Sequence, residues 1–387
     1  MSRPRRLLPL LVAAMAAATY APIAVGQLAG FIIDDLGITR TELGSLAAVA
    51  AIAGAAVSAT VGKRVDALGG RLGLLILFAG AAAGFAGLGL APSFVIMIAA
   101  MALAGIVQAA GNPVTNLLIA HWVSPGRRGA ITGIKQSGVQ LGVFIGGILA
   151  PAGAVTIGWR PTLLVVAGLL VVLAALSSGI PDDRGDRPTG HGNDPAAGPF
   201  IRPAFITWLA TYGFLLGFAG SMVYFIPLYA EEVLGMSRQT GGLASSVVGL
   251  SAVVARIAWG RFAERTGRFR WSLAVIAAGG VLAVGLFGLA ASASWLIWPA
   301  AVVFGATASS WNSVGMLAII ARGPRGAGAS SGQVLVGYLA GLGVGPIVLA
   351  WIVDQTSAYA TSWLVSGVVY LLGVGLTRRP AARTLAA

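Results

Sequence analysis

The 387-residue chain is 57% hydrophobic and only 10% charged, with a mean hydropathy of +0.88. Soluble domains carry about 25% charged residues, so this composition excludes an ordinary soluble protein and indicates that lipid covers most of the surface. The lack of cysteine excludes disulfides and thiolate metal sites, and two histidines argue against a histidine metal centre. The formal net charge of +13 is dispersed between apolar spans, which does not favour nucleic-acid binding.

Twelve apolar stretches are long enough to cross a bilayer, for which a helix needs about 20 residues. They predict helices at 7–33, 41–61, 72–91, 93–121, 129–156, 160–180, 203–230, 240–260, 271–291, 294–321, 326–352 and 358–377. The basic start is also compatible with a secretory signal, but the apolar run continues to Ile33, so we expect a retained first helix. The predicted fold class is therefore an all-α integral membrane protein.

Basic residues are unevenly distributed between the two sides that these spans create. With the N-terminus inside, 20 of the 25 Lys and Arg fall on the inner side, and three, Arg40, Arg160 and Arg238, fall on the outer side. Because basic loops remain cytoplasmic, we expect a multi-pass protein of the cell membrane with both termini in the cytoplasm.

A charged, glycine-rich stretch at 62–71 returns in the second half at 260–268. In both copies a carboxylate follows a glycine by four residues and precedes another glycine by three. The carboxylates, Asp66 and Glu264, are 198 positions apart, about half of the chain. This spacing predicts a duplicated unit with a charged loop at the same place in each copy.

Glycines of the fifth predicted helix also repeat about half a chain later. Gly138, Gly142 and Gly146 are followed after 199 positions by Gly337, Gly341 and Gly345. Near the midpoint the composition becomes polar and rich in Pro and Gly, as in a flexible linker. We therefore expect two six-helix bundles, at 1–180 and 203–387, joined by a cytoplasmic linker at 181–202.

With these features the chain resembles the major facilitator superfamily of transporters over nearly its whole length. The marks are twelve helices, a central linker and the Gly-x-x-x-Asp-x-x-Gly-x-Arg pattern after the second helix, although Ala67 stands where a basic residue is frequent. The resemblance implies two pseudo-symmetric six-helix bundles that work by alternating access, as a monomer in the lipid bilayer, without enzyme activity or cofactor. It also implies a conformational gate formed by Gly62, Asp66, Gly69, Arg71, Gly260, Glu264 and Gly267, while simple topology anchors are the alternative for the basic residues.

The glycine pattern of the fifth helix also resembles the antiporter motif of exporters in this superfamily. Gly129 is followed at the required spacings by the other glycines, but Val143 occupies the position of the motif's proline. A small-residue packing face explains the same pattern.

Two charged residues fall inside the predicted spans, and both are cations. Lys135 lies seven residues beyond Arg128, roughly 10 Å into its helix, and Arg256 lies eight residues before Glu264, roughly 12 Å by the same rise. Ionisable residues inside a membrane are functional candidates by default, although both side chains could also snorkel to the cytoplasmic face. Because no carboxylate falls within a span, an anionic substrate is the natural counter-ion.

Local patterns around these cations resemble branches of the superfamily that carry anions. Arg256-x-x-x-Gly260 resembles monocarboxylate and oxalate/formate carriers, and residues 133–138 resemble bacterial cyanate/nitroimidazole permeases. An arginine fork suits a planar carboxylate, whereas lysine acts as a point charge. We expect the substrate-binding residues to be Lys135, Arg256, Gln136, Asn112, Asn116, Tyr20, Tyr224, Asn312 and Gln333. For the polar residues among them, interhelical hydrogen bonding is the alternative role.

The leading hypothesis is thus a secondary transporter of a small organic acid-like anion, with protons as a candidate coupling ion and no metal. The alternative is a proton-coupled efflux antiporter for drugs or metabolites, which would need Asp34 or Asp35 as the proton carrier. A third hypothesis, a membrane sensor or scaffold, lacks an appended signalling domain in the sequence.

Overall fold

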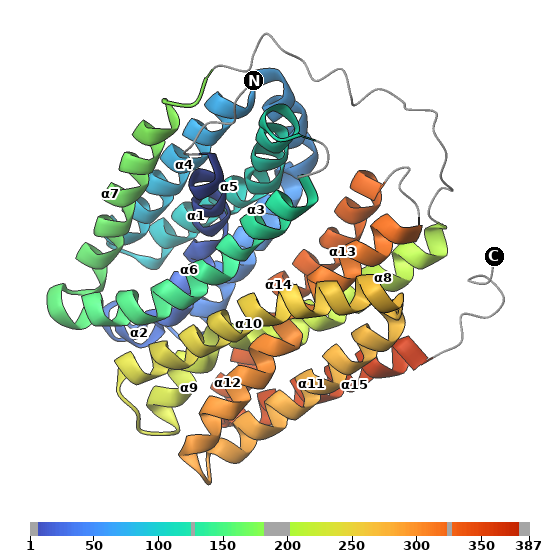
Figure 1. Cartoon of the computed structure of the whole chain (residues 1–387). Helices are drawn as coiled ribbons and strands as arrows, with labels where there is room; N and C mark the ends of the chain where they lie inside the picture. The colour runs from blue at the N-terminus through green and yellow to red at the C-terminus, as the bar shows by residue number, and fades with distance from the viewer. Residues whose placement is uncertain (1–6, 125–127, 182–201, 323–326, 379–387) are drawn as a thin grey trace. The chain divides into compact units, whose positions relative to one another are not determined.

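The computed structural model describes residues 7–124, 128–181, 202–322 and 327–378, and within these ranges it contains helices and no strands (Figure 1). The first half forms α1 (Leu7–Gln27), α2 (Ala29–Leu36), α3 (Arg40–Leu68), α4 (Gly70–Leu90), α5 (Phe94–Trp122), α6 (Arg128–Ile157) and α7 (Trp159–Ser177). The second half forms α8 (Pro203–Gly220), η2 (Ser221–Phe225), α9 (Ile226–Glu232), α10 (Arg238–Thr266), α11 (Phe269–Ala290), η3 (Ser294–Leu296), α12 (Ile297–Ala306), η4 (Ala308–Ser310), α13 (Trp311–Arg322), α14 (Ala327–Thr356) and α15 (Tyr359–Arg378). Twelve of the described helical segments are long and apolar enough to cross a membrane, which confirms the predicted fold class.

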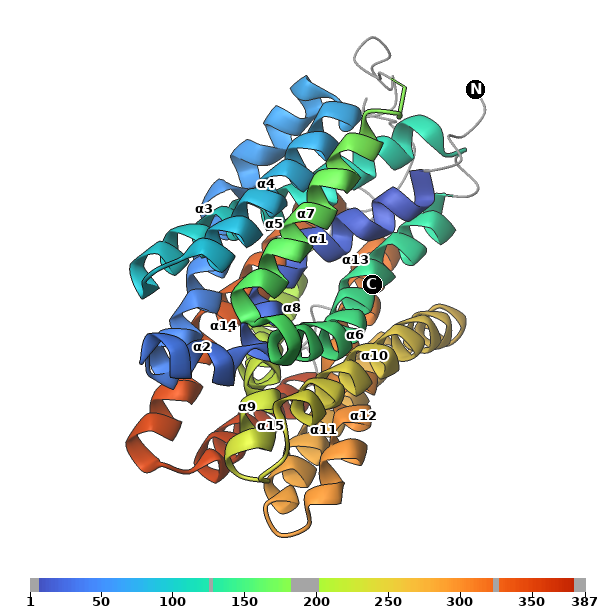
Figure 2. The ribbon, with the colours of Figure 1, turned by 90° about the vertical axis from the view of Figure 1, so that its left-hand side faces the viewer.

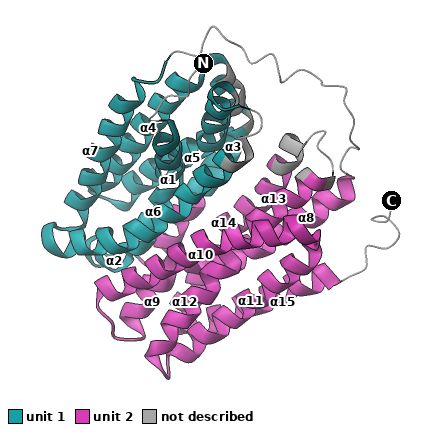
Figure 3. Ribbon diagram, in the orientation of Figure 1, with its two compact units in different colours: residues 1–38, 49–195 teal, residues 39–48, 196–387 magenta. Residues whose placement is uncertain are grey.

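The chain divides into two compact units, residues 1–38 with 49–195 and residues 39–48 with 196–387 (Figure 3). In the first unit the most extensive packing joins α4 to α7 and α1 to α6, and these pairs run side by side in both views (Figures 1 and 2). In the second unit it joins α8 to α14 and α11 to α15. These are the corresponding helices of the two halves, so each unit repeats one packing scheme. Most of the expected linker, residues 182–201, lies outside the described residues.

Left-handed backbone positions repeat with the same spacing. Gly69 (φ 82°) follows α3, and Gly267 (φ 65°), 198 positions later, follows α10. Glycine adopts this conformation without the steric cost of a Cβ atom, so it can end a helix and turn the chain. The other positive-φ residues of the described part pair likewise, Gly37 with Gly235 and Gly158 with Ser357.

The charged stretch at 62–71, expected as a loop, is mostly helical. α3 continues through Leu68, and Gly69 alone separates it from α4. Lys, Arg, Ala and Leu are strong helix formers, so the helix continues until a left-handed glycine ends it. Conversely, 3-10 turns interrupt the helices expected to be continuous at 203–230 and 294–321.

The repeated glycines allow close approach of helix backbones. A Cβ atom on Gly138 of α6 would overlap the carbonyl oxygen of Val12 in α1, and one on Gly341 of α14 would overlap the carbonyl oxygen of Phe214 in α8. Small residues at such contacts are typical of packed membrane helices. This packing supports the structural interpretation of the glycine pattern in α6.

We predict that Gly138→Ala destabilises the protein, because the new methyl group has no space against α1. The expected loss in the free energy of unfolding is about 1–3 kcal/mol, as for other overpacked sites. Gly133→Ala on the same helix is the matched control, because its Cβ would meet nothing within 4 Å. Denaturant unfolding of the purified variants in detergent measures the difference, and equal stabilities would contradict this packing role.

The first turn of α3 is held in the second unit by ion pairs. Arg40 donates from Nε and Nη2 to the two carboxylate oxygens of Glu232, at 2.9 and 2.7 Å, and from Nη1 to Asp354 at 3.3 Å. The hydroxyl of Tyr359 donates to Glu232 at 2.6 Å, and Asp354 accepts the backbone N–H of Thr41 at 2.8 Å. Arg40 and Thr41 thus bind to acidic residues of the unit to which residues 39–48 belong.

We predict that Arg40→Gln lowers the Tm, because it leaves Glu232 and Asp354 without their cation. Hydrogen bonds to charged groups are worth about 1.5–3 kcal/mol, which corresponds to a decrease of several degrees. Arg238→Gln is the comparison, since Arg238 pairs with Glu231 only seven residues away. If both variants melt at the same temperature, the Arg40 cluster has no special role in stability.

Candidate functional site

Lys135 is a fully buried cation, with 0% of its surface exposed, in α6. Its ammonium donates to Thr115 Oγ1 and Asn116 Oδ1, both at 2.6 Å, and to Asn112 Oδ1 at 3.3 Å. An ammonium has three N–H donors, so all of them are used. All three acceptors are neutral, and no described carboxylate pairs with this lysine. The charge is therefore solvated but not neutralised.

One face of α5 supplies these acceptors. Asn112, Thr115 and Asn116 have the i, i+3, i+4 spacing that places side chains on the same side of a helix. Thr115 Oγ1 also donates to the carbonyl oxygen of Gly111 at 2.7 Å, which turns its lone pairs toward the lysine. Sequence reasoning identified the two asparagines but missed Thr115, although the same spacing includes it.

The lysine also fixes how the asparagine amides are oriented. Because an ammonium can only donate, each amide must turn its oxygen toward Lys135. Gln136 Nε2 donates to the same oxygen of Asn112, at 2.8 Å. The Nδ2 groups of Asn112 and Asn116 make no hydrogen bond with any described residue, and Asn116 is exposed while Asn112 and Gln136 are half-buried. The cluster therefore combines a buried positive charge with accessible amide donors, which suits an oxyanion.

Arg256 of α10 is the cation of the second unit that the sequence places inside a span, and it is half-buried. Its Nε and Nη2 both donate to the carbonyl oxygen of Ser309, at 3.1 and 2.9 Å. Ser309 lies in η4, where the helix is interrupted, and Trp259 Nε1 donates to the nearby carbonyl oxygen of Ala306 at 2.8 Å. Two of the five guanidinium N–H donors are thus used, and no described carboxylate forms an ion pair with Arg256.

Aromatic and amide groups of the second unit lie near this arginine. Tyr338 of α14 lies in the neighbourhood of Arg256 and of Tyr224 in η2. The ring of Tyr338 also packs on Trp311, with centroids 5.2 Å apart. Asn312, next in α13, has a buried Oδ1 without a hydrogen-bond partner. Tyr224 and Asn312 thus belong to η2 and α13 of the same unit, and their role as lining residues remains a prediction.

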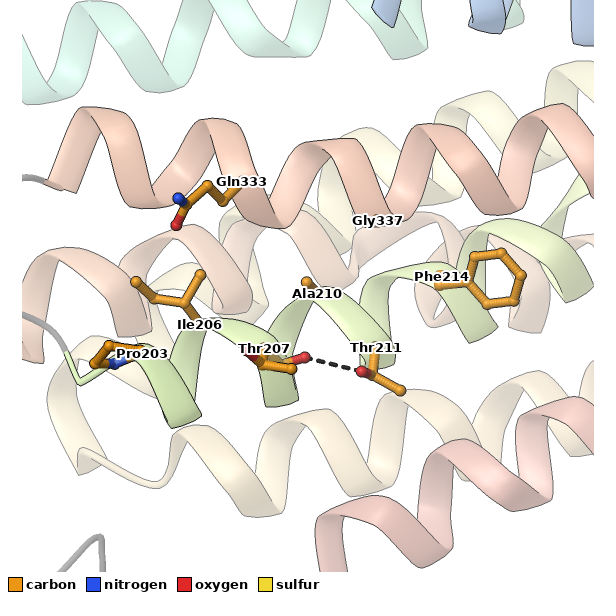
Figure 4. Close-up of a pocket in the computed structure, with 8 residues that line it drawn as sticks. All are labelled: Pro203, Ile206, Thr207, Ala210, Thr211, Phe214, Gln333 and Gly337. Atoms are coloured by element: carbon orange, nitrogen blue, oxygen red, sulfur yellow. Dashed lines mark hydrogen bonds between the residues drawn. The ribbon is translucent and has the colours of Figure 1, made fainter.

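Two further expected binding residues, Tyr20 and Gln333, make contacts within their own units. Tyr20 donates to Gln27 Oε1 at 2.9 Å, and Gln27 Nε2 donates to the carbonyl oxygen of Val143 at 3.0 Å, so these residues join α1 to α6. Gln333 lines an open groove of about 550 Å³ between α8 and α14 (Figure 4). The polar groups of that groove are Gln333, Thr207 and Thr211, and none of its lining residues is charged.

The expected gate residues occupy corresponding helix ends. Gly69 follows the end of α3, and Gly267 follows the end of α10. Glu264 is exposed in the last turn of α10, and Gly260 lies earlier in the same helix. Arg71 is half-buried in the first turn of α4. The backbones of Gly62 and Asp66 lie in α3, and the Asp66 side chain lies outside the described part. A gating role for this set remains a prediction. In the described ranges, no group of three or more His, Asp or Glu side chains could hold a metal ion.

We predict that Thr115→Val destabilises the protein by about 1–3 kcal/mol, because a buried ammonium loses an acceptor. Combining it with Lys135→Met should remove most of this loss, since no charge remains to be solvated. A double-mutant cycle on the free energy of unfolding measures this coupling. Strictly additive effects would show that Thr115 does not solvate the lysine.

Comparison with known proteins agrees with this architecture. The sequence model of the Major Facilitator Superfamily matches residues 9–339. A protein of Cupriavidus necator named as a probable sulfoacetate transporter, SauU, is 27% identical over 90% of this chain and 86% of its own length. A protein of Agrobacterium vitis named as a putative tartrate transporter is 25% identical over 70% of this chain and 69% of its own length. The crystal structure of a bacterial homologue of the human lysosomal transporter Spinster shares the fold, with a TM-score of 0.74, 17% identity and 97% coverage of both chains. The protein thus belongs to the Major Facilitator Superfamily, and it is a multi-pass membrane transporter of a small molecule rather than an enzyme.

Proposed function

We propose that the protein is a secondary transporter of small organic anions, with Lys135 and Arg256 as its cationic substrate-binding residues. The observation that carries the proposal is the Lys135 cluster, in which a buried ammonium contacts neutral oxygens only. Burying an unpaired charge in a membrane protein is costly, and such residues usually serve function. A bound anion offsets that cost.

The two cations suit different parts of an acid. Lysine supplies a compact charge, while arginine presents a planar fork that matches the two oxygens of a carboxylate. Arg256 retains donors beyond those that bind Ser309. The amide groups of Asn112, Asn116 and Gln136 add neutral donors and acceptors for hydroxyl or carboxylate oxygens.

The substrates named for two relatives are doubly charged acids, while a third relative is named for hexuronate, which has one carboxylate. Sulfoacetate combines a sulfonate with a carboxylate, and tartrate has two carboxylates and two hydroxyls. A substrate with two negative charges would match the number of uncompensated cations. We therefore propose a small dianionic, oxygen-rich acid as the substrate class.

The efflux alternative gains no support from the acidic residues that it requires. Asp34 and Asp35 are exposed at the end of α2, and Asp35 accepts hydrogen bonds from Arg160 at 2.7 and 3.2 Å. The glycines of α6 that resemble an antiporter motif pack against α1.

The remaining features of the proposal follow from the charge distribution and the family. The protein works by alternating access in the cell membrane as a monomer, with both termini in the cytoplasm. Its bundles span 1–180 and 203–387, joined by the linker at 181–202. Either protons or a second anion serves as the coupled species.

Uptake of radiolabelled tartrate and sulfoacetate into proteoliposomes tests this function. We expect saturable uptake of at least one acid, and a decrease of at least about tenfold for Lys135→Met and for Arg256→Gln, because each variant removes a charged hydrogen bond worth 1.5–3 kcal/mol. Arg261→Gln, which changes an exposed cation on the same helix as Arg256, should transport normally.

Full transport by both interior variants would overturn the assignment of these residues. Absence of uptake for every mono- and dicarboxylate, together with drug resistance that depends on Asp34, would favour efflux instead.

A further inference from the structure

A second groove, of about 380 Å³, lies where the beginning of α11 meets the end of α15. Two arginines line it, Arg270 in the first turn of α11 and Arg378 at the last residue of α15. Trp271 lies beside them and is 51% exposed. The groove therefore has a cationic end with an aromatic ring at its edge, and none of its lining residues is acidic.

The rest of the groove is apolar and continues along both helices. Its wall consists of Ala274, Val275, Ala278 and Val374. Beyond the groove the same two helices expose large aliphatic side chains, at Leu282 and Leu289 of α11 and Leu364, Val368, Leu371 and Leu372 of α15. In a membrane protein such a surface faces lipid tails, so the groove opens toward the bilayer.

Local contacts hold the Arg270 guanidinium at the groove. Its Nη2 donates to the carbonyl oxygen of Thr377 at 2.8 Å, and the guanidinium carbon Cζ lies 5.5 Å from the centre of the Trp208 ring. The positive end of the α11 dipole lies at the same place, because Arg270 belongs to the first turn of that helix. Arg378 is exposed and adds a second charge. The negative end of the α15 dipole lies there too and offsets that of α11, so the two arginines supply the positive charge at this end of the apolar groove.

The geometry points to a binding site for an anionic phospholipid, with the phosphate-bearing headgroup at Arg270 and Arg378 and an acyl chain along the apolar wall. Basic pockets between membrane helices are a recognised way to bind such headgroups, and a tryptophan at the edge suits the interface. Free phosphate would use the cationic end alone, whereas a lipid uses both parts of the groove. This site is separate from Lys135 and Arg256, so it does not depend on the proposed anion transport.

Native mass spectrometry of the purified full-length protein, titrated with phosphatidylglycerol or with phosphatidylcholine of the same acyl chains, tests the site. We expect tighter binding of phosphatidylglycerol, and a loss of about fivefold in its affinity for Arg378→Gln, because one basic residue near an anionic lipid is worth about that factor. Arg265→Gln, an exposed arginine in the last turn of α10, is the matched control and should bind normally.

Arg270 also donates a hydrogen bond to the carbonyl oxygen of Thr377, so its replacement by Gln would affect folding as well as the charge. The variant to test at this position is therefore Arg270→Lys, which keeps the charge and should retain most of the preference for phosphatidylglycerol. Equal affinity for the two lipids, or unchanged affinity in Arg378→Gln, would overturn the proposal. Displacement of phosphatidylglycerol by an equal concentration of inorganic phosphate would also overturn it, because the site would then take a free anion.

Discussion

A charged group buried in a membrane protein must be solvated by the protein itself, because lipid offers no hydrogen bonds. Lys135 meets this requirement with three neutral oxygens from one face of α5. Arg256 meets it differently, through a backbone carbonyl that becomes available where a 3-10 turn interrupts the helix between α12 and α13. In both places neutral oxygens solvate the cation, and no carboxylate of the described residues compensates its charge. An anionic substrate is the species that would complete these sites.

The two cations break the internal repeat that the rest of the architecture follows. The same helix pairs pack in each half, and turn glycines and close-packed glycines repeat at offsets of 198 or 199 residues, so the two units share one framework. The cations do not repeat: 198 and 199 positions after Lys135 stand Gln333 and Val334, and 198 positions before Arg256 stands Ser58. The units also differ at the partner helix, since α5 is continuous while its counterpart is interrupted at η4. The sequence thus departs from its internal symmetry at the residues that we assign to the substrate.

Periodicity and composition predicted much of this structure, because a lipid environment permits few solutions. Twelve apolar runs, the repeated glycines and the shared face of Asn112 and Asn116 were all readable from the chain. Features that depend on tertiary contacts could not be predicted from the sequence. No residue pattern predicts that Arg256 binds the carbonyl oxygen of Ser309. Nor does any pattern predict that Arg40 pairs with Glu232 and Asp354, which are 192 and 314 positions away. The helical extension of α3 to Leu68 was missed because charge and glycine content suggested a loop, although the propensities of its residues favour a helix.

The most direct test of the central claim is an experimental structure with a bound dianion such as tartrate or sulfoacetate. We predict density for an acidic group with an oxygen about 2.7–3.2 Å from Nζ of Lys135 or from the guanidinium of Arg256. We also predict that at least one of the neutral contacts of the engaged cation lengthens to admit the anion. A bound acid that contacts neither cation, while both keep their present hydrogen bonds, would contradict it.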